Sequence, residues 1–340
     1  MKVIHRSSTG YLAAVLTLMA ISIGWFLSKP NTPWVLGVTK RSSSPDVPAE
    51  LRAPEILSKP MEYLSDSVRA EIYKQRTDRV REYCKYMPND TIIADMKMQE
   101  PDEVNEADFP MVVDPIHKIL YCELPKVGSS NWKRVLIKLT DPRFSDIRNV
   151  LAIRKPRKYD HYNLKKINAY PYEERVEMLR TYYKFTVVRD PIERILSAYK
   201  DKAHEEFRGK AGAKVQELLK NQNRTKDFEE YDIESFHAFV QYLIARGPEA
   251  AAGGHYGVRV RHWTRFYDIC HFCAIDWDFI GKVESIYEDA TWLLNEAGVG
   301  NLVSYPYFKK ATATDTIKKY YQGLSRETLL RLSNQTNKFE

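Results

Sequence analysis

A polar segment between a predicted strand and a predicted helix is the feature that most constrains the fold of this chain. The segment, Pro-Lys-Val-Gly-Ser-Ser-Asn-Trp-Lys, spans residues 125–133 and follows the short apolar run 119–124. Apolar residues then recur at the i, i+3, i+4, i+7 spacing of an amphipathic helix: Trp132, Val135, Leu136 and Leu139. The pattern predicts a buried strand, a tight turn and a helix.

This turn is suited to binding a phosphate group. The backbone N–H groups of such a turn and the positive end of the helix dipole point at one anion. Lys126 adds a mobile cation, Gly128 permits the tight backbone, and further donors are Ser129, Ser130 and Asn131. The nucleoside triphosphate motif G-x-x-x-x-G-K-[ST] does not occur in the chain. The segment therefore predicts anion binding without indicating a kinase.

A second strand–turn–helix pattern follows at residues 184–202. The β-branched and aromatic run 185–188 predicts a second buried strand, and Asp190 is placed as the N-cap of the next helix. Pro191 is at the first helical position, and Glu193 is where a capping box places its carboxylate. Arg189 and Ser197 then supply a forked donor and a hydroxyl for a second phosphate group.

Strand-like and helix-like segments alternate over the last 250 or so residues, enough for one sizeable α/β domain. We expect a mainly parallel sheet, with both turns at the carboxyl ends of its strands. Further elements expected are a helix at 232–246, a strand at 277–283 and a helix opened by a Ser285–Glu288 capping box. The polar stretch between Asp201 and Asp232 is expected to be a surface loop.

The segments PKVGSSNWKRVL and VVRDPIERILSAYKDK resemble the 5′-phosphosulfate and 3′-phosphate binding motifs of Golgi carbohydrate sulfotransferases. The resemblance is strongest to the chondroitin/dermatan 4-O-sulfotransferase and HNK-1 sulfotransferase group, and the segment 262–285 extends it. The first motif has Gly128-Ser129-Ser130 where that group more often has Ala/Gly-Cys-Thr. Ser130 keeps a hydroxyl at the Thr position.

The resemblance implies 3′-phosphoadenosine 5′-phosphosulfate (PAPS) as sulfate donor, with no metal required. The donor-binding residues that it implies are Pro125, Lys126, Val127, Gly128, Ser129, Ser130, Asn131, Arg189, Asp190, Pro191, Ile192, Glu193, Arg194, Ile195, Leu196 and Ser197.

The amino-terminal region predicts a membrane anchor. Residues 11–28 are uncharged and mostly apolar, close to the roughly 20 residues that cross a bilayer. The basic residues before them predict a cytosolic tail at 1–10 and hence a type II protein. A cleaved signal peptide is the alternative. We expect a Pro-rich luminal stem at 29–65 and a sulfotransferase domain at 66–340. The first segment of this domain, up to residue 86, is compatible with a helix. It either packs on the rest of the domain or serves as a charged spacer.

The luminal assignment determines how cysteines and sequons are interpreted. The four cysteines, Cys84, Cys122, Cys270 and Cys273, suggest disulfides with three possible full pairings. The Cys270-x-x-Cys273 spacing has no partner pair for zinc, so no metal site is predicted. Glycosylation sequons begin at Asn89, Asn223 and Asn334, and in a luminal chain each one that lies on a loop is expected to be glycosylated.

Lys and Arg number 52 against 45 Asp and Glu. Basic clusters occur at 154–158 with 165–166, and at 259–265. A luminal protein does not encounter nucleic acid. The excess of basic residues therefore either keeps the surface soluble or binds a polyanionic glycan such as a glycosaminoglycan.

Transfer of sulfate to a sugar hydroxyl requires charge stabilisation and a base. Lys126 is placed to neutralise the leaving oxygen. His161, between the first predicted helix and the second strand, is the favoured general base, by similarity to heparan sulfate 2-O-sulfotransferases as well as by position. His262, in the third resembling segment, is the rival base and a substrate-binding candidate.

The sequence thus predicts a Golgi type II sulfotransferase acting on O-4 of N-acetylgalactosamine in chondroitin or dermatan. The alternatives are 3-O-sulfation of a terminal glucuronate and a catalytically silent glycan-binding Golgi protein.

Overall fold

The computed structural model describes residues 64–86, 110–154, 156, 161–203, 225–246, 261–307 and 314–336. The predicted cytosolic tail, the predicted span at 11–28 and nearly all of the predicted stem lie outside these ranges, as do Asn89 and Asn223. No helix within the described ranges has the length and apolarity needed to cross a membrane.

A five-stranded sheet in the order β3-β1-β2-β4-β5 forms the centre of the domain. The strands are β1 (Met111–Asp114), β2 (Ile119–Cys122), β3 (Lys165–Lys166), β4 (Tyr183–Val188) and β5 (Phe279–Lys282). β2, β4 and β5 pair in parallel, whereas β1 is antiparallel to both β2 and β3.

The sheet is therefore mixed. The expectation of a mainly parallel sheet holds for β2, β4 and β5 and is wrong for β1 and β3, which pair antiparallel. The reason is the short connection between β1 and β2, because so few residues can join only antiparallel neighbours. Asp114 stabilises this hairpin: its buried carboxylate accepts hydrogen bonds from the N–H groups of Ile116 and His117, each at 3.0 Å.

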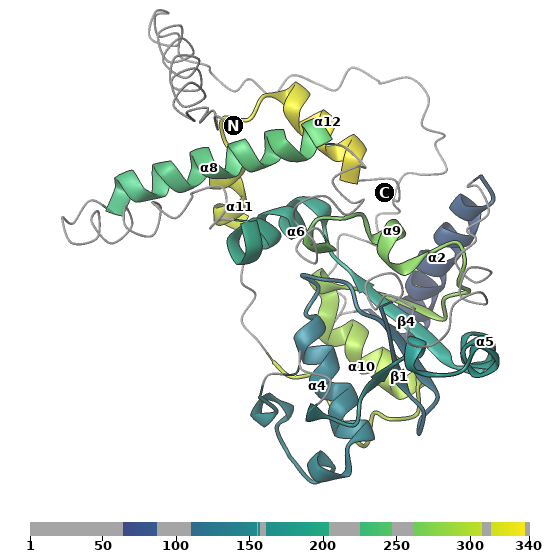
Figure 1. Ribbon diagram of the computed structural model, residues 1–340. Helices are drawn as coiled ribbons and strands as arrows, with labels where there is room; N and C mark the ends of the chain where they lie inside the picture. Colours follow the sequence, from purple (N-terminus) through teal and green to yellow (C-terminus); the bar gives the residue numbers. More distant parts are fainter. Residues whose placement is uncertain are drawn as a thin grey trace, which may run out of the picture. The chain divides into compact units, whose positions relative to one another are not determined.

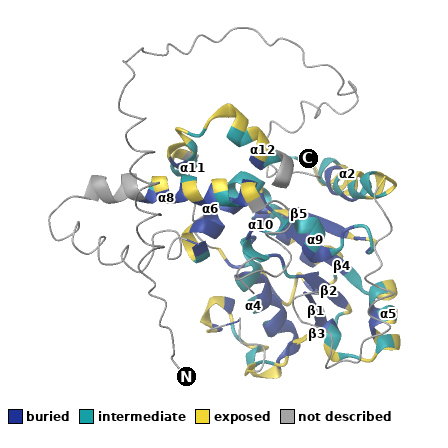
Figure 2. Cartoon of the chain, turned by 45° about the horizontal axis from the view of Figure 1, so that its top comes forward, coloured by how far each residue is buried: buried dark blue, intermediate teal, exposed yellow. Residues whose placement is uncertain are grey.

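Helices cover the sheet (Figure 1). α4 (Ser129–Thr140) and α10 (Ile286–Glu296) lie side by side against it. α2 (Asp66–Cys84) packs on β5 and α10, and α5 (Tyr172–Thr181) directly precedes β4. The strands are almost wholly buried, as Figure 2 shows. α10 begins after Ser285 as predicted, but the Ser285 side chain makes no capping hydrogen bond, so the predicted capping box is wrong.

α2 packs on the domain, which decides between the two alternatives left open for this segment. Its Tyr73 is buried, and the Tyr73 hydroxyl donates to the Asp289 carboxylate of α10 at 3.1 Å. Arg76 forms an ion pair with the same carboxylate at 2.6 Å. A disulfide between Cys84 and Cys273 closes the end of the helix onto the domain.

A second disulfide joins Cys122 of β2 to Cys270. The two cysteines of the Cys-x-x-Cys motif therefore bond to separate, distant partners. Among the described residues no cluster of His, Cys, Asp and Glu is arranged to hold a metal ion.

A helical layer adjoins the sheet through α6 (Pro191–Ala198), which follows β4 and continues as a π-helix, Tyr199–Ala203. α8 (Thr225–Arg246), α11 (Thr314–Tyr321) and α12 (Arg326–Thr336) pack with it around a second hydrophobic cluster that includes Leu196, Phe236 and Leu332. The predicted helix at 232–246 is confirmed as the later part of α8, whose first residues fall in the stretch expected to be a loop.

Asn334 lies in the last turn of α12 and not on a loop, so the condition for expecting its glycosylation is not met. The remaining short elements are α9 (Phe266–Cys270) and the 3-10 helices Pro142–Phe144, Val150–Ala152, Ile167–Ala169 and Val283–Ser285.

Candidate active site

The predicted phosphate-binding turn follows β2 and opens α4. Lys126 and Gly128 both have left-handed backbone conformations, with φ of 71° and 83°. A non-glycine residue in this region is uncommon and stores strain, so Lys126 marks a constrained position. Gly128 is the N-cap of α4, and no side chain caps the helix. The first amides of α4 therefore point at the mouth of the turn, as an anion site requires.

The second motif joins β4 to α6. Asp190 caps α6 as predicted, because its carboxylate accepts a hydrogen bond from the Glu193 N–H at 2.9 Å. The Glu193 carboxylate does not complete the predicted capping box. It instead binds the Arg189 guanidinium at 3.1 Å, and Glu284 accepts the hydrogen bond from the Asp190 N–H at 2.9 Å.

The two motifs are joined directly by arginine side chains. Arg189 donates to the carbonyl of Lys126 at 3.3 Å, and Arg194 donates to the carbonyl of Pro125 at 3.4 Å. Both arginines are buried, with exposed fractions of 8% and 5%. The second motif therefore holds the backbone of the first turn in place, which the two patterns taken separately do not predict.

Arg194 also connects a third segment to this site. It donates to the carbonyls of Arg261 at 3.1 Å and Thr264 at 2.7 Å, and its guanidinium lies over the Phe266 ring at 4.2 Å. Burial and the nearby Arg189 charge lower the pKa of Arg194 to about 9. Arg194 thus binds protein carbonyls, although the resemblance implied a role towards the donor.

Lys126 is held by a carboxylate from the π-helix. Its Nζ donates to Asp201 Oδ2 at 3.0 Å, and only 16% of the Lys126 side chain is exposed. Burial lowers the pKa of Lys126, the Asp201 carboxylate opposes that effect, and the charges of Arg189 and Lys202 add to it. Asp201 was not singled out from the sequence, because no short-range pattern relates it to a lysine so far away along the chain.

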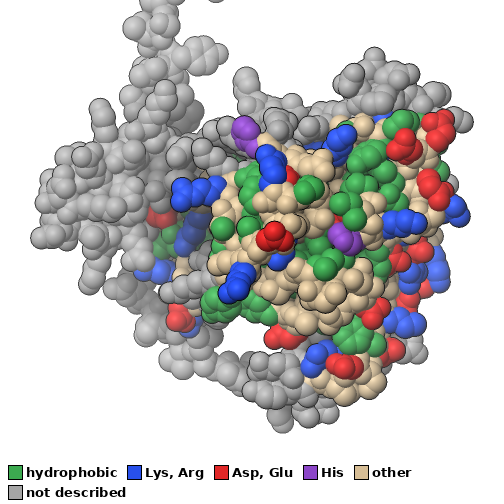
Figure 3. Space-filling view, turned by 90° about the horizontal axis from the view of Figure 1, so that it is seen from below, with side chains coloured by type: hydrophobic (Ala, Val, Ile, Leu, Met, Phe, Trp, Pro, Cys, Tyr) green, Lys and Arg blue, Asp and Glu red, His purple; other side chains and the backbone are tan. Residues whose placement is uncertain are grey.

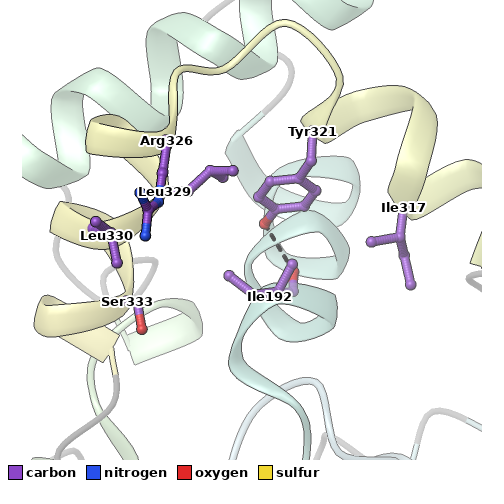
Figure 4. Close-up of a pocket in the computed structure, with 7 residues that line it drawn as sticks. All are labelled: Ile192, Ile317, Tyr321, Arg326, Leu329, Leu330 and Ser333. Atoms are coloured by element: carbon purple, nitrogen blue, oxygen red, sulfur yellow. Dashed lines mark hydrogen bonds between the residues drawn. The ribbon is translucent and has the colours of Figure 1, made fainter. Parts of the chain in front are cut away.

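The apolar members of the two motifs face the protein interior. Val127, Ile195 and Leu196 are fully buried or nearly so. Ile192 lines a pocket of about 400 Å³ between α6, α11 and α12, and its carbonyl accepts a hydrogen bond from the Tyr321 hydroxyl at 2.9 Å (Figure 4). This pocket is lined mainly by apolar side chains and lies away from the phosphate-binding turn, so it does not form part of the anion site.

The polar members lie in the first turn of α4 and in the last turn of α6. Ser129 and Ser130 are partly exposed in the first turn of α4, and Ser197 is buried on α6. Asn131 is buried and accepts a hydrogen bond from Arg134 at 2.9 Å. Tyr305, which was not predicted, packs its ring 4.7 Å from that of Trp132 beside this turn.

His161 is exposed and lies near the far end of α4 from the turn. Its carbonyl accepts a hydrogen bond from Arg143 at 2.7 Å, and the neighbouring Asn163 donates to the carbonyl of Thr140 at 3.1 Å. A helix of this length separates its ends by about 18 Å. These contacts do not support the expected position of His161 above the donor sulfate, and its role as base stays a prediction.

His262 lies near both motifs. The carbonyls of Arg261 and Thr264 on either side of it are held by Arg194. Burial, followed by the charges of Lys126 and Lys202, lowers the pKa of His262 to about 3. Its Nδ1 is buried and has no hydrogen-bond partner. His262 is therefore neutral at physiological pH and close enough to Lys126 to respond to its charge.

Comparison of the sequence with known proteins identifies the family of this chain. The profile of the Sulfotransferase family matches residues 109–339. The chain belongs to the sulfotransferase family. It is 30% identical to human carbohydrate sulfotransferase 10 over 301 residues, which cover 84% of this chain and 80% of that protein. It is 29% identical to carbohydrate sulfotransferase 11 of Rattus norvegicus over 265 residues, covering 76% and 71%. No solved structure matches the chain significantly.

The family expected from the two motifs is thus confirmed, and the matched range contains both of them. The surface of this sulfotransferase is electrostatically mixed on the face shown in Figure 3, where basic side chains alternate with acidic ones. The described residues on this face therefore form no continuous basic patch, although the whole chain carries a formal charge of +7.

Proposed function

We propose that this protein transfers sulfate from PAPS to a sugar hydroxyl of a glycosaminoglycan, O-4 of N-acetylgalactosamine in chondroitin or dermatan. The observation that carries the proposal is the direct connection between the two anion-binding motifs. Arg189 and Arg194 bind the carbonyls of Lys126 and Pro125, so the uncapped start of α4 and the start of α6 open onto one site. Two linked anion sites suit a donor that carries two phosphate groups.

PAPS supplies an activated sulfuryl group, and the chain supplies positioning and charge. The first amides of α4 and the hydroxyls of Ser129 and Ser130 bind the 5′ anion. Arg189 and Ser197 bind the 3′-phosphate. Lys126 neutralises the charge that develops on the leaving oxygen, which is the step most dependent on a preorganised cation.

We further propose His262 as the general base, with His161 as the alternative. The neutral imidazole of His262 can accept the proton of a sugar hydroxyl, and its pKa is depressed partly by Lys126 and Lys202. Pairing those two cations with donor anions removes their repulsion and raises the pKa of His262 towards a useful range. Burial, the largest cause of the low pKa, stays in place, so donor binding reverses only the part that the two cations cause.

We also propose that the protein is a Golgi type II membrane protein with its catalytic domain in the lumen. The two disulfides support an oxidising compartment. The predicted anchor at 11–28 and the sequons at Asn89 and Asn223 agree with that location.

The test is transfer of radiolabelled sulfate from PAPS by the purified full-length chain. Desulfated chondroitin, dermatan and a glucuronate-terminated glycan serve as acceptors. Label recovered in 4-sulfated disaccharide supports the proposed acceptor, and label only on the glucuronate glycan replaces it. No transfer to any of the three acceptors, with the nucleotide still bound, contradicts the chondroitin assignment.

The bases are separated with a matched pair of variants, His262→Gln and His161→Gln. We expect His262→Gln to lower kcat by about 100-fold, within the usual range for a general base, and His161→Gln to leave it nearly unchanged. The reverse result would assign the base to His161.

A further inference from the structure

The π-helix that extends α6 carries an acidic residue into the phosphate-binding site. Residues Tyr199–Ala203 form this turn, directly after α6, at the end of the second motif. π-helical turns are rare, widen the helix and re-aim its side chains, and they occur often at functional sites. Here the turn brings the Asp201 carboxylate to Lys126 Nζ at 3.0 Å. A carboxylate repels an anion that binds beside it, so its presence in this site calls for a compensating role.

Asp201 lies between two cations. One carboxylate oxygen binds Lys126, and the other is 3.7 Å from Lys202 Nζ. The Lys126 side chain is 16% exposed and that of Asp201 33%. The ion pair is therefore mostly shielded from solvent but keeps an exposed side at Asp201. When an anion takes Lys126, Lys202 remains beside the released carboxylate.

We propose that Asp201 is a positioning residue that keeps Lys126 charged and aimed at the turn until the donor's anionic group replaces the carboxylate. The inference rests on the proposed use of a phosphosulfate donor. The ion pair holds the amine of Lys126 in place, although the Lys126 backbone is in the strained left-handed region. Asp201 thus substitutes for the donor in the free enzyme.

Several charges act on the Lys126 amine. Asp201 and Lys202 come from the π-helix, and Arg189 follows the end of β4. His262, from the segment before α9, is also near the amine but is neutral. Burial, Arg189 and Lys202 all favour the neutral amine, and Asp201 is the group that opposes them. Removing the Asp201 charge lowers the pKa of Lys126, so the positive charge is lost at a lower pH.

The experiment measures the Lys126 amine without any donor. Competitive acylation of lysines in the full-length chain, analysed by mass spectrometry from pH 6 to 11, gives the pKa of each amine. We expect Asp201→Asn to lower the pKa of Lys126 by about one unit or more, and Asp201→Glu to restore most of the difference. Asp276→Asn, which removes a carboxylate from the Arg81 ion pair at the surface, is the matched control. An unchanged Lys126 pKa in Asp201→Asn overturns the proposal.

A second measurement separates this proposal from the proposed donor. Binding of 3′-phosphoadenosine 5′-phosphate is followed by calorimetry between pH 7 and 10. We expect Asp201→Asn to bind at least as tightly as the wild type at pH 7, since an opposing charge is gone, and to lose affinity at a pH about one unit lower. Loss of affinity by the same factor at every pH indicates a merely structural role and overturns the proposal. If wild type binds no nucleotide while the Lys126 pKa still depends on Asp201, the donor assignment fails alone.

Discussion

The two strand–turn–helix motifs solve the same task in different ways. The first has a glycine N-cap with no side-chain capping bond, and its cation pairs with Asp201, which is 75 positions away in the chain. The second has a side-chain cap from Asp190, and its cation Arg189 pairs with Glu193 four residues later. The second motif is therefore stabilised locally, whereas the first depends on the second for its geometry.

This difference suggests a division of work. The uncapped start of α4 keeps its amides available for the reacting end of the donor. The start of α6 is already capped by Asp190, and Arg189 and Arg194 hold the neighbouring turn. In the proposed function Arg189 also binds a phosphate group. Variants in each motif should therefore affect different kinetic quantities.

Replacing Lys126 by Met is expected to have the largest effect. The amine neutralises charge in the transition state, so kcat should fall by about 100- to 1000-fold with a smaller change in the donor KM. Steady-state kinetics at saturating acceptor measures both. A change confined to the donor KM would mean that Lys126 only binds donor and would remove the distinction between the motifs.

Replacing Arg194 by Leu tests the connection between the motifs. Three backbone carbonyls lose their buried charged donor, and we expect the free energy of unfolding to fall by about 3 kcal/mol. Urea denaturation measures this. Arg180→Leu is the control, because Arg180 pairs with Glu177 at the surface and its loss should barely matter. Equal effects would show that Arg194 does not hold the site together.

Replacing Arg189 by Gln should raise the donor KM by about 10- to 30-fold while kcat changes much less. A forked donor to a phosphate group contributes about equally to ground state and transition state, so its loss is a loss of uniform binding. The same assay as for Lys126→Met provides the comparison. A fall in kcat as large as that of the lysine variant would contradict the proposed division of work.

Replacing Glu193 by Gln is expected to have the smallest effect. Glu193 is 29% exposed, and after the change the buried Arg189 still donates to the carbonyl of Lys126, so little stability should be lost. Removing the negative charge beside the phosphate site should lower the donor KM by about threefold or less. A large loss of stability would show that this ion pair, and not the Asp190 cap, stabilises the start of α6.

Short-range patterns predicted the parts of the fold that depend on neighbours in the chain. β2 and β4, the helices that follow them and the Asp190 cap were all predicted, because strand alternation, helix periodicity and capping act over a few residues. β1 and β3 were missed. Both are short, and β3 consists of Lys165 and Lys166, whose place in the sheet comes from pairing with β1.

The candidate site divides in the same way. From adjacent residues the sequence predicted two strand–turn–helix motifs, with Lys126 and Arg189 as their cations, and a similarity to sulfotransferases; the structure contains both motifs and the family is confirmed, whereas their binding of anions stays a prediction. Only the tertiary structure shows which cysteines pair, that Arg194 binds carbonyls and that Asp201 holds Lys126. It also places His262 near Lys126, whereas the contacts of His161 are at the other end of α4. The physical reason is range: a turn or a cap is a property of adjacent residues, whereas an ion pair or a disulfide between distant residues exists only after the core has brought them together.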